Sequence, residues 1–312
     1  MHSRLVSVAS LVVLSLMTSA SLALAEEPAA APGAAPPKEA KEEHAEGRYP
    51  VAEAERPLTL PSMVLMGELD LDFPRVNILG AFGAASATTF ANVSIGASFG
   101  VTDDLTVRAQ VLPLQLAGGG GFHYGQSSAV FGGIDNPGPG VGATYRFLKG
   151  DFEVGADLDL SLITAQSFSG VVIAPGVPVR VHVGKSLRID TGAYLPITRA
   201  SLSVATTNFG TTSTGASTTG LIIPVSVLYD ITEPIHIGAA TGFTIGDFSD
   251  VGDSAAIPLG LFAGYAIGGK DGPVLDIDPF FTFPGLITPG GSNGTNSGSY
   301  VFGVSVGGFL YL

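Results

Sequence analysis

The strongest constraint on this chain is a two-residue alternation of apolar and polar side chains in residues 91–116. Val93 and Ile95 on the first arm, and Leu105 and Val107 on the second, alternate with small or polar residues. A period of two puts alternate side chains on opposite faces, so each arm predicts a β-strand with one apolar face. The sequence VTDD between the arms suits a tight turn.

This unit recurs along the chain, with short and long connections in strict alternation. The pattern predicts about twelve antiparallel strands of roughly 9–13 residues, long enough to cross a bilayer when tilted. Prolines within several expected strands remove ladder donors, so a count of about ten to fourteen stays open. Tight turns are expected near residues 102, 149, 185, 231 and 270. Longer connections are expected at residues 74–88, 117–136, 166–172, 200–218, 249–254 and 288–298.

We therefore expect an all-β fold, a single antiparallel transmembrane β-barrel. The mean hydropathy of +0.42 is high and only 13% of the residues are charged, while 43 Gly and 21 Pro interrupt the apolar runs. After residue 25 the apolar runs are too short for a spanning helix. A closed sheet pairs every backbone group inside hydrocarbon, with Tyr and Phe expected at both membrane interfaces. An exported soluble β-sandwich is the alternative, and its strands are usually shorter.

Three regions divide the chain. Residues 1–25 carry Arg4, an apolar run and the small-residue site Ala23-Leu24-Ala25, which predicts a cleaved signal peptide. Residues 26–60 are rich in Ala, Pro and Glu, so we expect a disordered periplasmic linker. Residues 61–312 are expected to form the barrel.

Two turns and the last strand resemble Gram-negative outer-membrane β-barrel proteins of the porin and transporter kind. The turns are FGVTDDLTV at residues 99–107 and YDITEPIHI at residues 229–237. The last strand resembles the signal read by the barrel assembly machinery, but it ends in Tyr311-Leu312 where that class usually ends in Phe. The resemblance implies an outer-membrane location, with outer-membrane lipid and the assembly machinery as partners. If the tight turns face the periplasm, both termini are periplasmic.

The polar strand faces would line the lumen. Closure would bring Asp276 and Asp278 beside Glu68, Asp70 and Asp72, with no base from these strands, and such an acidic wall favours cations. The remaining wall would be mixed and carry arginine. The complete set of expected lumen residues is Glu68, Asp70, Asp72, Arg108, Arg146, Glu153, Asp157, Asp159, Arg180, His182, Arg188, Asp190, His236, Asp276 and Asp278. The Gly-rich loop at residues 117–136 could fold inward as a constriction, with Phe122, His123, Tyr124 and Phe131 as its candidate residues.

These features predict a barrel that passes small solutes by passive diffusion through a narrow, acidic-leaning lumen. A non-conducting structural, ligand-binding or adhesive barrel is the main alternative. A barrel hydrolase is less favoured, because no Ser and acid spacing near His182 or His236 suggests an activated nucleophile. We expect no enzyme activity, cofactor or metal site. The net charge of −13 argues against nucleic acid as a partner.

Overall fold

The computed structural model describes residues 49–79, 85–89, 92–115, 139–165, 168–206, 210–287 and 300–312. Residues 47–312 form one compact unit. The expected signal peptide, residues 26–48 of the expected linker, and the candidate constriction residues Phe122, His123, Tyr124 and Phe131 lie outside the described residues.

Strands dominate the described chain and form one antiparallel sheet of 15 strands. In chain order they are β1 (Val64–Leu79), β2 (Ala85–Thr89), β3 (Asn92–Thr102), β4 (Leu105–Gln115), β5 (Gly140–Leu148), β6 (Phe152–Ala165), β7 (Phe168–Val183), β8 (Leu187–Tyr194), β9 (Ile197–Thr206), β10 (Gly210–Thr219), β11 (Leu221–Thr232), β12 (Ile235–Ile245), β13 (Ala255–Gly268), β14 (Pro273–Ile287) and β15 (Tyr300–Tyr311). Short helical turns are η1 (Glu53–Glu55), η2 (Phe248–Asp250) and α3 (Val251–Ser254).

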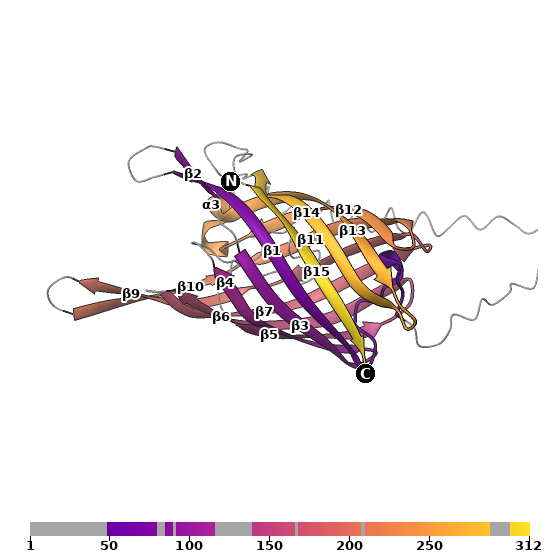
Figure 1. Cartoon of the computed structure of the whole chain (residues 1–312). Coiled ribbons are helices and arrows are strands. Elements are labelled where there is room, and N and C mark those ends of the chain that lie inside the picture. Colours follow the sequence, from indigo (N-terminus) through magenta and orange to yellow (C-terminus); the bar gives the residue numbers. More distant parts are fainter. Residues whose placement is uncertain are drawn as a thin grey trace, which may run out of the picture. The chain divides into compact units, whose positions relative to one another are not determined.

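Twelve of these strands close into a ring (Figure 1). The order β7-β6-β5-β4-β3-β1-β15-β14-β13-β12-β11-β8 returns to β7 through the β7–β8 pairing. The first and last strands pair from Val64↔Tyr311 to Arg75↔Tyr300. A closed ring leaves no free sheet edge within its wall. The expected all-β, single antiparallel barrel of about twelve strands is confirmed.

Apolar side chains cover the outside of the ring. On β13, Leu259, Leu261 and Tyr265 are exposed, whereas Phe262 and Ala266, each the residue after an exposed one, are buried. The two-residue period that the sequence shows is thus an outside–inside alternation. Other exposed apolar side chains are Leu69, Ile95, Val107, Val141, Leu158, Leu160, Ile173, Val177, Val227, Ile237, Ile277 and Leu310.

Aromatic side chains mark two levels of the wall. Exposed Tyr145, Phe152, Tyr229 and Tyr265 lie close to tight turns, on strands that start or end there. Toward the other end of β1 and β15, the rings of Phe73 and Phe302 stack with centroids 5.0 Å apart, and nearby Phe281 and Tyr300 are 5.5 Å apart. Two aromatic levels around an apolar band are the pattern of a barrel that crosses a bilayer. The described residues contain no helix with the length and apolarity needed to cross a membrane.

The barrel has two different ends. We call the tight-turn end the one that carries the β3–β4, β5–β6, β7–β8, β11–β12 and β13–β14 connections. At the opposite end three expected longer connections differ from the structure. Residues 166–172 are mostly strand, because β6 and β7 pair up to Ala165↔Phe168. The expected loop at residues 200–218 falls largely within the β9–β10 hairpin, which pairs with β7 and extends beyond the ring (Figure 1). The stretch at residues 74–88 contains the end of β1 and most of β2.

The physical reason is the same in these three stretches. Each contains β-branched residues that suit a pleated strand: Val76 and Ile78 at residues 74–88, Val171 and Val172 at residues 166–172, and the threonines of residues 200–218. At residues 200–218 the Ser and Gly content favoured a loop instead.

Candidate functional site

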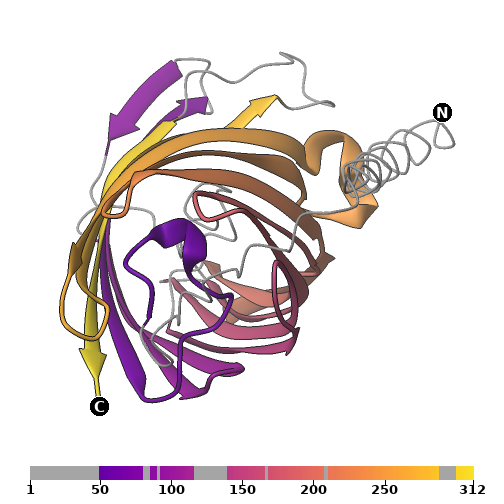
Figure 2. The ribbon, with the colours of Figure 1, turned by 90° about the vertical axis from the view of Figure 1, so that its right-hand side faces the viewer.

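An N-terminal segment lies inside the ring. Figure 2 shows η1 and its flanking chain within the circle of strands. We call residues 49–61 the inner segment. The sequence analysis placed residues up to 60 in a disordered linker, and the structure differs for the part that begins at Tyr49. Tyr49 and Leu60 are buried in one apolar cluster with Val64 and Phe309 of the barrel. Burial of these apolar side chains, which are scattered among Ala, Pro and Glu, explains why this part of the segment packs against the barrel.

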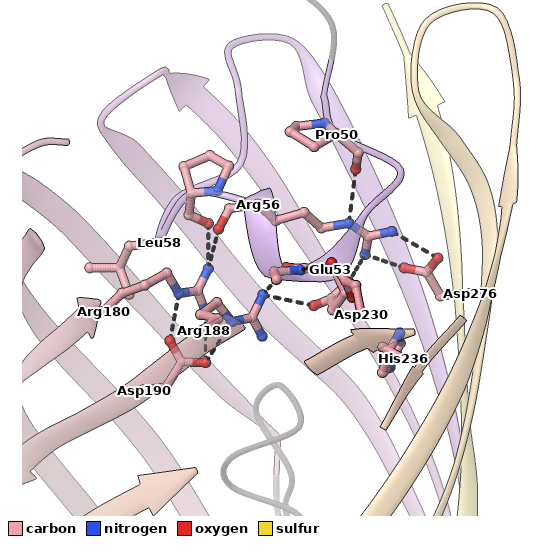
Figure 3. A network of polar contacts seen from close by, with 12 residues as sticks. Pro50, Glu53, Arg56, Leu58, Arg180, Arg188, Asp190, Asp230, His236 and Asp276 are labelled. Carbon is pink, nitrogen blue, oxygen red and sulfur yellow. Dashed lines mark hydrogen bonds and ion pairs between the residues drawn. The ribbon is translucent and has the colours of Figure 1, made fainter. Parts of the chain in front are cut away.

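Arg56 is the centre of the inner segment's contacts (Figure 3). Its Nη2 donates to Oδ1 of Asp276 on β14 at 3.0 Å, and its Nη1 contacts the second oxygen of that carboxylate and Oε2 of Glu53. The guanidinium also lies 5.3 Å from the ring centroids of Tyr49 and Phe309. The sequence analysis expected a wall around Asp276 without a base. The base comes from the inner segment.

Two arginines of the wall hold the inner segment by its carbonyl groups (Figure 3). Nη1 of Arg180 on β7 donates to the carbonyl oxygens of Arg56 and Pro57, at 2.9 and 2.6 Å. Nη1 of Arg188 on β8 donates to the carbonyl oxygen of Glu53 and lies 3.2 Å from its Oε1. The recognition is thus directed largely at the peptide backbone.

Acceptors of the wall bind the backbone N–H groups of the same segment. The N–H of Ala54 donates to Asp230 at 2.8 Å, and the N–H of Leu58 donates to Glu153 at 2.6 Å. The N–H of Leu60 donates to Oγ1 of Thr106 at 2.8 Å.

Two more contacts involve the tight turns and their neighbours. The carbonyl of Ala54 lies 2.7 Å from Nδ1 of His182, and Oγ1 of Thr59 donates to the carbonyl of Asp103 at 2.7 Å. The strands and turns that touch the inner segment therefore come from all around the ring.

Charge on the inner segment is stabilised by its neighbours. Burial opposes ionisation of Glu53, but the Coulombic attraction of Arg56 and Arg188 outweighs it and holds the pKa of Glu53 below its ordinary value. Burial raises the pKa of Tyr49 to about 12, against the opposing effect of Arg56. Both the carboxylate and the phenol therefore keep their usual protonation state at neutral pH.

Arg108 on β4 forms a second charged cluster. Its Nη2 lies 2.7 Å from Oδ1 of Asp159 and 2.8 Å from Oδ1 of Asp157, both on β6. Strand β5 runs between them, and Gly142 is the β5 residue in register with both Arg108 and Asp159. A Cβ at Gly142 would lie 1.9 Å from the Asp159 oxygen. The pair exists because this position has no side chain.

His236 and Asp278 repeat this arrangement. His236 on β12 stands opposite Gly264 on β13, and its Nε2 lies 3.0 Å from Oδ1 of Asp278 on β14. A Cβ at Gly264 would lie 1.9 Å from that oxygen and 2.2 Å from the imidazole.

Pairs between neighbouring strands complete the charged lining. Nη1 of Arg146 lies 2.7 Å from Oε1 of Glu153, and Nε of Arg180 lies 2.6 Å from Oδ1 of Asp190. Glu153 is in register with Arg180, but the carboxylate that pairs with Arg180 is that of Asp190 on β8.

The acids that were expected to share one wall lie on β1 and β14, the two strands that pair with β15. Oγ of Ser94 donates to Asp70 at 3.0 Å, and Oγ of Ser305 donates to Glu68 at 3.2 Å. All fifteen expected lumen residues are buried or partly buried, a placement that fits the interior of the ring: Glu68, Asp70, Asp72, Arg108, Arg146, Glu153, Asp157, Asp159, Arg180, His182, Arg188, Asp190, His236, Asp276 and Asp278. Among the described residues, no group of three or more His, Asp or Glu is placed to hold a metal ion.

Part of the interior is apolar, which the sequence analysis missed. Leu228, Phe262 and Phe280 are buried together with Ala54 of the inner segment. A Cβ at Gly238 would lie 2.1 Å from the ring of Phe262. The assumption that only polar side chains point into the lumen overlooks such residues. A glycine beside an inward aromatic is the signal that could have found them.

A cavity of about 370 Å³ lies between the inner segment and the wall. Its lining includes Arg56 and Tyr49 of the inner segment, and Glu68, Asp159 and Tyr194 of the wall. Carboxylates, guanidinium groups and a phenol thus share one space large enough for a small polar solute.

A closed ring with an apolar exterior and a charged interior decides the type of fold. The chain folds as an outer-membrane-type β-barrel. No family model matches the chain, and no curated protein matches it. Among solved structures, it is similar to the NanC porin at 10% identity and a TM-score of 0.48, over 77% of this chain and 98% of that one.

Two further solved structures are also similar. An outer-membrane channel from Pseudomonas putida F1 is 12% identical with a TM-score of 0.47, over 81% of this chain and 97% of that one. The monoaromatic hydrocarbon channel CymD is 9% identical with a TM-score of 0.40, over 81% of this chain and 90% of that one. The description of this barrel therefore rests on its own strand register and side-chain placement.

Proposed function

We propose that this protein is an outer-membrane channel that passes small solutes by passive diffusion through a narrow, acidic-leaning lumen. The observation that carries the proposal is the contrast between the two faces of the ring. The outside is apolar and suits hydrocarbon, whereas the inside holds charged side chains around a cavity of about 370 Å³. A barrel that only had to fill its interior could do so with apolar side chains at lower desolvation cost.

The acidic leaning follows from the balance of inward charges. Each described lumen arginine already contacts at least one carboxylate: Arg56–Asp276, Arg108–Asp159, Arg146–Glu153, Arg180–Asp190 and Arg188–Asp190. Nine of the fifteen expected lumen residues are Asp or Glu and four are Arg, so acidic side chains outnumber guanidinium groups and the lumen favours cations.

The rest of the proposal concerns location. The signal peptide directs export and is removed after residue 25, and the barrel assembly machinery inserts residues 61–312 into the outer membrane of a Gram-negative cell. The tight-turn end and both termini face the periplasm. Outer-membrane lipid surrounds the apolar band, and small solutes are the ligands. We assign no catalytic residue.

A non-conducting barrel is the second candidate, because the inner segment occupies the tight-turn end (Figure 2). Planar-bilayer recording separates the two. Refolded protein of residues 26–312, wild type and with Arg56→Ala, is recorded in a KCl gradient. Conductance steps with a reversal potential that favours K⁺ support the channel. If both proteins insert and are heat-modifiable on gels but neither conducts, the channel proposal is wrong and the non-conducting barrel stands. Protein that never inserts would contradict the proposed membrane location.

A further inference from the structure

The inner segment is held at the tight-turn end mainly by its backbone and one side chain. Arg180 and Arg188 donate to its carbonyl groups, and Asp230 and Glu153 accept from its N–H groups. The side chain of the segment with the most specific contact is Arg56, which binds both carboxylate oxygens of Asp276. Such a set of contacts suits a short peptide that carries an arginine.

We propose that the inner segment is a displaceable plug, and that the tight-turn mouth of the barrel is a binding site for a short peptide with one arginine. In the structure this site is occupied by residues 49–61 of the same chain. The inference rests on the proposed channel function, because a plug closes a pore only where one exists.

The barrel does not need the inner segment to close. Every pairing in the ring runs between strands, and the first residue of the ring is Val64 of β1. The described part of the inner segment contains η1 but no strand, and it is joined to the wall through hydrogen bonds and ion pairs. Removal of the segment would therefore leave the ladder of the ring intact.

Release would expose groups that water can satisfy. Asp276, Arg180 and Arg188 would exchange protein partners for water, and the net free energy of a buried ion pair is small because desolvation offsets the attraction. The apolar contacts of the segment belong to two small clusters, one of Tyr49 and Leu60 with Val64 and Phe309, and one of Ala54 with Leu228, Phe262 and Phe280. An interface held largely by polar contacts can keep the segment docked and still let it dissociate.

The contacts also span the mouth. They reach β3–β4 at Asp103, β6 at Glu153, β11 at Asp230 and β14 at Asp276. Two glycines of the wall make room for the chain. A Cβ at Gly100 would lie 1.8 Å from the carbonyl oxygen of Pro61, and one at Gly272 would lie 2.6 Å from that of Tyr49. A segment held from so many sides blocks the path through this end.

The test locks the inner segment in place. The chain has no cysteine, so an introduced pair has no competitor. A Cβ at Gly268 would lie 3.2 Å from Cγ2 of Val51, close to the spacing of a Cβ and the partner sulfur in a disulfide. The double variant Val51→Cys/Gly268→Cys is refolded in full length from residue 26, oxidised, and recorded in planar bilayers before and after a reductant is added. Each single-cysteine variant is the control.

The expected result is a loss of conductance steps in the oxidised double variant, restored by the reductant, with no response in the single variants. Equal conductance in the oxidised and reduced forms would overturn the plug and leave the channel proposal intact. Absence of conductance in the double variant in both redox states, in its controls and in Arg56→Ala would overturn both proposals.

A synthetic peptide tests the binding site without a disulfide. The probe is residues 49–61 as a free peptide, added to each side of a bilayer that contains the Arg56→Ala chain. We expect it to reduce conductance from one side only, whereas the same peptide with alanine in place of arginine should not. If both peptides reduce the conductance, or neither does, Asp276 does not recognise an arginine of the peptide.

Discussion

Arg108 on β4 contacts Asp159 on β6, two strands away, with Nη2 2.7 Å from Oδ1. Gly142 of the intervening strand is in register with both residues. The same arrangement joins His236 to Asp278 across a glycine of β13. At Gly142 and Gly264, therefore, ionisable side chains in this barrel contact each other across an intervening strand.

The substitution Gly142→Ala should break the first of these contacts. The added methyl would lie 1.9 Å from Oδ1 of Asp159 and 3.0 Å from Nη2 of Arg108, so the pair must separate. We expect the free energy of unfolding to fall by about 1–3 kcal/mol, the usual cost of a lost buried hydrogen bond. Urea unfolding in detergent micelles measures it. The matched control is Gly67→Ala on β1, where no atom lies within 4 Å of the new methyl. Equal stability of the two variants would contradict the prediction.

The ring of strands could be predicted from the sequence because its physics is local. Alternation of Leu259, Leu261 and Tyr265 with small or buried neighbours follows from one strand lying between lipid and lumen. The inward position of Asp276 follows from the same period. Where Thr and Val mix with Ser and Gly, as in β9 and β10, that local signal was too weak and a loop was expected.

The contacts of the interior could not be predicted in the same way. Arg56 and Asp276 are 220 residues apart, and the inner segment has no two-residue period that would place it. Its average composition is that of the linker before it, which conceals Tyr49 and Leu60. The pairs that cross a glycine depend on strand register, because register decides which residue lies between Arg108 and Asp159. The alternation of side chains along one strand does not give that register.

Glu68→Gln should reduce the cation preference of the lumen. Glu68 lines the cavity and accepts a hydrogen bond from Ser305, so its carboxylate charge faces the solute. A unit charge at 4 Å in water attracts a cation by about 1 kcal/mol, which corresponds to at most about a fivefold change in the permeability ratio. Reversal potentials in a KCl gradient measure that ratio. Glu233→Gln, on an exposed tight turn, is the control and should leave the ratio unchanged. An identical shift in both variants would contradict a local effect of Glu68.

Acid should loosen the inner segment. Because Arg56 and Arg188 hold the pKa of docked Glu53 below its ordinary value, against the effect of burial, ionised Glu53 favours docking. That contribution is complete above the ordinary Glu pKa of about 4.3 and is lost as the pH falls through the lower, docked pKa. The chain has no Trp, so Tyr49→Trp provides a single reporter of burial. Its emission should shift to longer wavelength at acid pH.

The control for this titration is Glu53→Gln on the Tyr49→Trp background. The neutral side chain cannot pair with Arg56, so the emission should already be shifted at neutral pH and should respond less to acid. Asp276, Asp230 and Glu153 also contact the segment and can leave a residual response. An acid response as large as that of the parent would show that Glu53 does not control docking.

Gly100→Ala should open the tight-turn mouth without touching any charge. Gly100 lies on β3, and a methyl there would lie 1.8 Å from the carbonyl oxygen of Pro61 and 2.8 Å from that of Leu60. Backbone atoms cannot yield as a flexible side chain can, so the inner segment must move. Gly96→Ala, on the same strand, is the matched control, because the nearest atom to its methyl would be 3.8 Å away. We expect a higher open probability in planar bilayers for Gly100→Ala alone. If both variants insert and conduct as the wild type does, the inner segment does not limit the flow through this end.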